Sequence, residues 1–149
     1  MNNIILHEIS KDDLKHILEN HSLWVKTDEK EGEQANLAGY NLRGVVLLGE
    51  NLIKANFKGA YLYGAYLKNS NFEKANLSDA NLRGANLRWV NLQGANLSGA
   101  NLVRADLHES NLNETNLFGT NLKMSDGLSQ MQIDQAQTNK STELPKLLQ

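Results

Sequence analysis

The residue types that most often carry out chemistry are few in this chain, and their spacing does not assemble them into a site. The four histidines are His7, His16, His21 and His108. No two of them have the spacing that places two metal ligands on one face of a helix. Glu109 and Glu114 are carboxylates five residues apart, but acid–base work needs an environment that shifts their pKa values. We interpret the histidines as solvated or end-capping residues and the two glutamates as solvated surface.

Motifs for nucleophilic catalysis and for nucleotide or metal binding are also missing. The chain has no cysteine, which excludes disulfides and thiolate metal ligands. It contains no Gly-x-Ser-x-Gly nucleophile motif, no Walker-type phosphate loop and no dinucleotide-binding glycine fingerprint. We therefore expect no enzymatic activity, no metal and no cofactor.

Most of the asparagine and glycine belongs instead to a strict period of five, which runs through eighteen consecutive units over residues 35–124. If the central residue of a unit is called i, position i is Leu in sixteen units and Phe57 or Phe72 in the other two. Position i−1 is Asn in fourteen units, and position i−2 is Ala in ten. Nine of the eleven glycines stand at i+2. Asparagine can bond nearby backbone in turns and glycine tolerates positive φ, so both residue types have a structural explanation.

Neither regular element has a period of five. Every fifth residue of an α-helix is rotated by about 140°, so the leucines would cover all sides of a helix. In a straight strand a step of five moves each leucine to the opposite face. The pattern instead predicts a chain that makes a short extended stretch, turns and repeats, with each i residue pointing toward a common axis.

Units such as Ala-Asn-Leu-Ser-Asp at 75–79 and Ala-Asn-Leu-Arg-Gly at 80–84 resemble the pentapeptide-repeat proteins, whose consensus is A(D/N)LXX. The resemblance covers residues 35–124. It implies an all-β solenoid, a right-handed quadrilateral β-helix with four units per coil and about four and a half coils. In that geometry each residue stacks on the residue twenty positions later, and the i residues form four inner columns.

The two flanks are expected to cap the solenoid, because its end coils would otherwise expose backbone edges and apolar columns. Residues 1–34 are predicted to form a helical cap, with a helix over 10–19 that Ser10 begins as N-cap. Residues 125–149 are predicted to form a short helix over 127–136 and a loose tail, with Leu128 and Met131 on the last coil.

One inner position carries a charge. Glu50 occupies i−2, and a buried carboxylate without a partner is costly. We expect Glu50 to be buried in the first coil and to bond the N-terminal cap; a ligand site there is the alternative.

A group of aromatic and cationic residues is the candidate partner-binding patch, on the two adjoining faces built on the second and third columns. Its members are Tyr61, Tyr63, Tyr66, Lys68, Arg83, Arg88 and Trp89. Exposed Tyr, Trp and Arg are enriched at binding hot spots. Tyr61 and Tyr66 replace the usual asparagine at i−1, so local turn bonding is given up there. The alternatives are that the tyrosines only cover the backbone of the rod, or that the patch forms a homodimer.

Charge distribution separates the function classes. Residues 1–34 carry a net −4, residues 35–124 a net +3 and residues 125–149 a net −1. A branch of the family imitates DNA, binds DNA gyrase and protects it from quinolones, but its rods are typically acidic, and +3 is the wrong sign to imitate phosphates. A charge of +3 is also a weak field for direct nucleic-acid binding. The resemblance therefore implies a bacterial protein-binding or scaffold module of unknown partner, with a gyrase-binding DNA mimic as the alternative. No signal-peptide pattern or membrane span is visible, so a cytoplasmic protein without membrane contact is expected.

Overall fold

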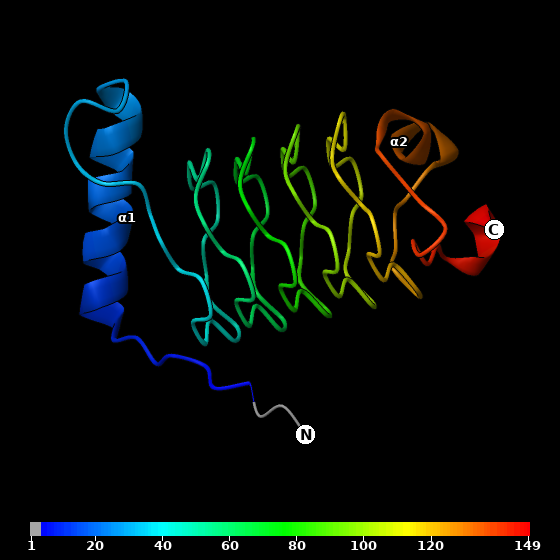
Figure 1. Ribbon diagram of the computed structural model, residues 1–149, viewed down its shortest axis with the longest axis horizontal. Helices are drawn as coiled ribbons and strands as arrows, with labels where there is room; N and C mark the ends of the chain where they lie inside the picture. The colour runs from blue at the N-terminus through cyan, green and yellow to red at the C-terminus, as the bar shows by residue number, and fades with distance from the viewer. Residues whose placement is uncertain (1–3) are drawn as a thin grey trace.

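The computed structural model describes residues 4–149. Its helices are α1 (Lys11–Lys26), α2 (Gln130–Gln135) and the short 3-10 helix η1 (Lys146–Leu148). Between α1 and α2 the chain winds as a stack of coils, with α1 across one end and α2 and the C-terminus at the other (Figure 1).

The coils are joined by parallel β-bridges between i−1 residues twenty positions apart, beginning with Asn36 and Asn56. Each contact is a single-residue bridge, and each unit adds backbone hydrogen bonds on both sides. The Asn56 amide donates to the Ala35 carbonyl at 2.9 Å, and the Leu37 amide donates to the Asn56 carbonyl at 2.7 Å. Four units therefore make one turn of the solenoid, and each coil is the hydrogen-bonding template for the next.

The corners explain why asparagine and glycine repeat. The amide of the next unit donates to the carbonyl of residue i, as from Ala85 to Leu82 at 3.0 Å, which closes a four-residue turn. All eighteen i+2 residues have φ between 54° and 71°, the left-handed value that a type II turn requires at its third residue. At i−1, the asparagine side chain braces the same turn; Oδ1 of Asn81 accepts from the Arg83 amide at 3.1 Å.

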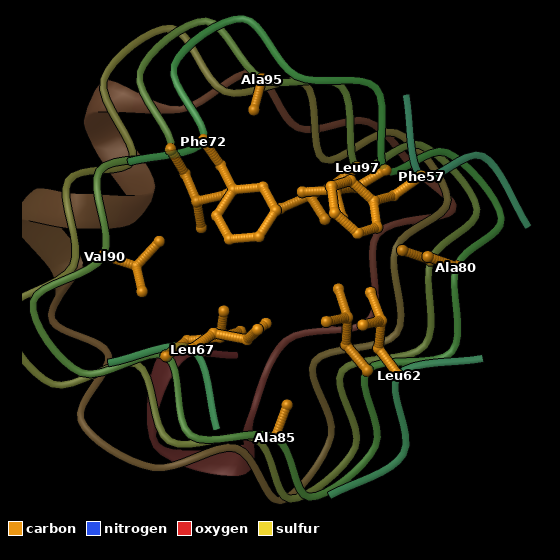
Figure 2. Packing of buried hydrophobic residues seen from close by; sticks show 14 of the residues in the cluster. Phe57, Leu62, Leu67, Phe72, Ala80, Ala85, Val90, Ala95 and Leu97 are labelled. Carbon is orange, nitrogen blue, oxygen red and sulfur yellow. The ribbon is translucent and has the colours of Figure 1, made fainter. Parts of the chain in front are cut away.

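The core is a column of aliphatic side chains along the solenoid axis. All eighteen i residues are buried. Figure 2 shows Phe57, Leu62, Leu67 and Phe72 pointing inward from four sides. Ring centroids of Phe57 and Phe72 lie 5.4 Å apart. The prediction that i residues form inner columns is confirmed.

Helix α1 begins as predicted, with the Ser10 side chain accepting from the Asp13 amide at 3.0 Å. It does not end at residue 19, because the stretch to Lys26 carries His21 and Trp24, whose stacked rings extend its packed face. His21 is completely buried.

The C-terminal expectations need three corrections. Helix α2 is shorter than 127–136, because Ser129 and Gln132 form a capping box that begins it at Gln130. Met131 is 69% exposed rather than packed on the last coil; Ile133 is buried there instead. The tail is not loose, since its residues Gln137 and Glu143 form bridges with the last coil and satisfy backbone groups at its edge.

The prediction for Glu50 is wrong. Glu50 is exposed although it occupies an i−2 position. Within residues 4–149 its side chain makes no hydrogen bond or ion pair. The physical reason is that α1 leaves a groove open at this part of the first coil, and Glu50 lines it.

Candidate partner-binding surface

The partner-binding patch lies on two adjoining faces of the solenoid, and we name them by the columns beneath them. The second face consists of the units centred on Leu42, Leu62, Leu82, Leu102 and Leu122. The third face consists of the units centred on Leu47, Leu67, Leu87 and Leu107. Residues at i−1, i+1 and i+2 of these units lie outside the buried core, so they form its surface.

Two tyrosines and an arginine form a cluster on the second face. Rings of Tyr61 and Tyr63 stack with centroids 6.1 Å apart and an interplanar angle of 11°. Cζ of Arg43, one coil below, lies 5.2 Å from the Tyr63 ring centroid. One coil above, the carbonyl of Arg83 accepts from the Gly64 amide at 2.9 Å, which fixes Arg83 beside Tyr63. The coil spacing thus lines up Arg43, Tyr63 and Arg83 along the rod.

A tryptophan held by two cations forms the second cluster, on the third face. Nζ of Lys68 lies 4.7 Å from the Trp89 ring centroid, and Cζ of Arg88 lies 5.0 Å from it. Trp89 is still 45% exposed. Cation–π contacts at such distances hold the indole in place with one part of its surface open to a partner.

An aspartate limits the positive charge at one side of this cluster. Asp106 accepts from Arg88 at 3.3 Å and contacts Nδ1 of His108 at 2.6 Å. Burial alone would raise the pKa of Asp106, but hydrogen bonds from His108 and Arg88 outweigh burial and hold that pKa below its ordinary value. Arg88 is therefore oriented by an ionised carboxylate as well as by Trp89.

The second face is cationic along its length. Its outward positions include Arg43, Arg83, Arg104 and Lys123 and no Asp or Glu. Lys123 is paired with Glu143 of the tail. Within residues 4–149, Arg43, Arg83 and Arg104 have no carboxylate within salt-bridge distance. The net +3 of the repeat is thus concentrated on one side of the rod.

The structure brings the predicted patch residues together as two clusters, Tyr61 with Tyr63 and Lys68 with Arg88 and Trp89. Tyr66 is 53% exposed. The loss of turn bonding at Tyr61 and Tyr66 is confirmed, since no side chain in the described residues accepts from the amides of Tyr63 and Lys68. Sequence reasoning missed Arg43 and Asp106, although a step of twenty residues back from Tyr63 leads to Arg43.

No group of three or more His, Cys, Asp or Glu residues within 4–149 is arranged to hold a metal ion. In the same range, no helix is both long enough and apolar enough to cross a bilayer.

Comparison with known proteins agrees with the repeat geometry. A family model described as pentapeptide repeats matches residues 33–69, 51–88 and 85–123, with eight copies. A search of curated proteins found no match.

Solved structures with similar folds include other pentapeptide-repeat proteins. One from the thylakoid lumen of Arabidopsis thaliana is 32% identical with a TM-score of 0.50, over 56% of this chain and 62% of that one. One from Nostoc is 20% identical with a TM-score of 0.60, over 86% of this chain and 84% of that one. QnrB1, a plasmid-mediated fluoroquinolone resistance protein, is 17% identical with a TM-score of 0.42, over 72% and 59%. This chain therefore spans about three-fifths of the thylakoid-lumen protein. With its repeats matched over more than half its length, the chain belongs to the pentapeptide-repeat family.

Proposed function

We propose that this protein is a non-catalytic binding or scaffold module whose partner is another protein. The module is a right-handed quadrilateral β-helix of about four and a half coils with helical caps, and the partner lies on the partner-binding patch. A stiff rod suits this role because its side chains are presented at fixed spacing and lose little freedom on binding.

The observation that carries the proposal is the preorganised cluster around Trp89. Lys68 and Arg88 already hold the indole, and Asp106 already orients Arg88. Aromatic and Arg side chains that are rigid and partly exposed are the types on which interface energy concentrates. A protein partner would gain apolar contact with the indole and hydrogen bonds from the guanidinium.

A DNA-mimicking gyrase-binding protein remains the second candidate function of the family, and the charge pattern opposes it. Such a mimic needs negative charge along the rod, whereas the second face carries arginines without carboxylates.

The test is recovery of partners from cells with the parent protein and with the double variant Tyr66→Ala, Arg88→Glu. We expect the variant to lose at least one partner that the parent recovers reproducibly, because it removes an exposed ring and reverses the charge beside Trp89. The matched control, Lys58→Glu with Phe118→Ala, changes one cation and one exposed ring on the first face, which is built on Leu37 and the i residues at steps of twenty from it.

Circular dichroism must show that both variants stay folded. If the patch variant recovers every partner that the parent does, the patch is not the binding surface. If the first-face control loses the same partners, the effect is one of general charge and not of this site.

A further inference from the structure

The N-terminal end of the solenoid is only partly paired, and the edge of the third face is one of the parts whose i−1 backbone groups have no partner in residues 4–149. On the second face, the extended residues before α1 take the place of a preceding coil: His7 forms a parallel bridge with Tyr40, and the Asn41 amide donates to the His7 carbonyl at 2.8 Å. Ile9 packs against the core next to this bridge. The chain then leaves the edge and enters α1, so nothing in residues 4–149 continues along the edge of the third face.

The open edge has unpaired backbone groups in a known register. In the coils above, the amide and the carbonyl of each i−1 residue on this face are both hydrogen-bonded to the preceding coil. The Asn86 amide, for example, donates to the Ala65 carbonyl, and the Asn86 carbonyl accepts from the Leu67 amide. Val46 occupies the same position in the first coil. In the described residues neither its amide nor its carbonyl has a backbone partner. An unpaired edge of this kind is a template for another extended chain.

Apolar side chains and a recess accompany the open edge. Val46 and Leu48 are 63% and 54% exposed. A groove of about 880 Å³ runs between the edge and α1, and its apolar lining comes from Ile9, Leu14 and Leu18 on one side and Val45, Val46 and Leu47 on the other. Glu50 is exposed because it lines this groove. If another unit of the solenoid filled the groove, it would cover Glu50 as the i−2 residues of later coils are covered.

Two observations favour a single extended segment of another protein as the occupant. Helix α1 forms one wall of the groove, so the flat end of a second rod would meet the helix before it reached Val46. The neighbouring part of this edge already pairs with one extended stretch of chain, at the bridge between His7 and Tyr40.

The parallel bridges set the direction of the occupant, and two charged side chains select the residues at its ends. Arg43 precedes the open stretch and Glu50 follows it, and both line the groove. The bridges of this solenoid are parallel, so an added strand in the same register has its amino end beside Arg43 and its carboxyl end beside Glu50. An acidic residue at the amino end and a basic residue at the carboxyl end are complementary to these side chains.

We propose that the edge at Val46 and the groove beneath α1 bind an extended segment of a partner protein, which adds as a parallel strand with an aliphatic residue over Leu47, an acidic residue before it and a basic residue after it. This site differs from the cluster around Trp89, but it adjoins the partner-binding patch, because Arg43 lines the groove and also contacts the Tyr63 ring.

The probe is a synthetic peptide with blocked ends, Asp-Gly-Ala-Asn-Leu-Ser-Gly-Lys, in which Leu falls in register with Leu47. Its matched control exchanges the terminal Asp and Lys. With the full-length protein we expect the first peptide to slow hydrogen exchange of the Val46 amide, measured by NMR. Exchange of the Tyr66 amide, already bonded to the Val45 carbonyl, should not change. The charge-exchanged peptide should bind about two- to fivefold more weakly, the range of exposed ion pairs.

A pair of variants tests the backbone pairing. Val46→Pro removes the free amide at an edge position, where proline is tolerated, and should weaken binding about tenfold relative to Val46→Ala, which keeps it. Equal binding by these two variants would overturn the proposal. So would unchanged exchange at Val46 in the parent protein at about 1 mM peptide, a reading that does not depend on either variant folding. If the protein alone sediments as a dimer with its Val46 amide already protected, a second copy fills the edge and the proposal fails.

Discussion

The amide of Ala35, the first residue of the repeat, donates a hydrogen bond of 3.0 Å to Nδ1 of His21 in the middle of α1. This bond joins the N-terminal helix to the solenoid. Because Nδ1 accepts, the proton of the neutral ring is on Nε2, and a second proton would have to displace the Ala35 amide. Burial lowers the pKa of His21 below its ordinary value of 6.5.

Acid should therefore weaken the protein through His21. Above pH 6.5 the ring is neutral in both the folded and the unfolded states and pH has no effect through it. Below pH 6.5 the unfolded state takes up the proton first, so the free energy of unfolding should fall by up to about 1.4 kcal/mol per pH unit. Urea unfolding at several pH values measures this contribution in the parent protein and in His21→Asn, whose side chain keeps an acceptor but does not titrate. The difference between the two proteins should shrink as the pH falls from 7.5 to 5; a difference independent of pH would contradict the role given to His21.

Two glycines with positive φ, one at a corner of the repeat and one just beyond its last unit, should differ in how much they matter for stability. Gly64 has φ of +63°, and no atom lies within 4 Å of the position that a Cβ would take. Gly64→Ala should therefore lower the free energy of unfolding only by the cost of holding alanine in the left-handed conformation, about 1–2 kcal/mol. At Gly127 an added Cβ would lie 2.3 Å from Cγ of His108 and 2.5 Å from the His108 amide nitrogen. Gly127→Ala should therefore destabilise the protein more than Gly64→Ala in thermal or urea unfolding. Equal losses would show that the end of the solenoid relaxes freely around residue 127.

Aromatic residues inside and outside the rod should differ sharply in their effect on stability. Phe72 is fully buried against Phe57, and Phe72→Ala should lower the free energy of unfolding by about 3–5 kcal/mol. Phe118 is 42% exposed at an i+1 position, and Phe118→Ala should change it by less than about 0.5 kcal/mol. Chemical denaturation of the two variants side by side makes the comparison, and similar losses would argue against the assignment of inner and outer positions.

The protein should not inhibit DNA supercoiling by gyrase at micromolar concentration. The reason is the sign of the charge on the second face, where arginines take the place that acidic residues need in a DNA mimic. A supercoiling assay with purified gyrase, with and without a quinolone, gives the measurement. Potent inhibition, or protection of gyrase from the drug, would replace the proposed function with the alternative.

Local rules explain why much of the fold could be predicted from the sequence. Leucine at i, asparagine at i−1 and glycine at i+2 each serve a separate need of one unit: the core, the turn and the left-handed corner. A step of twenty residues then places Tyr63 beside Arg83 and Lys68 beside Arg88, so the main members of the patch follow from the repeat alone.

The ends could not be predicted in the same way, because their contacts follow no repeat. Whether Glu50 is covered depends on where α1 crosses the first coil, and the residues of the repeat unit that contains Glu50 do not indicate the position of α1. Met131 and Ile133 both suit the apolar face of a short helix, and which of them meets the core depends on how α2 lies on the last coil, where Ile133 is buried and Met131 exposed. The tail pairs with the last coil through residues such as Gln137 whose sequence resembles no repeat unit.

The bridges between residues twenty positions apart also fix the length of the rod in whole coils. Each coil adds one strand spacing, about 4.8 Å, and each leaves the same hydrogen-bonding surface for its neighbour. Removing or duplicating twenty residues in the middle of the stack would therefore change the distance between the two ends by a fixed increment while both ends keep their own contacts. Related proteins can therefore differ in length by whole coils. The distance between two partners bound at opposite ends of the rod then changes in fixed steps during evolution.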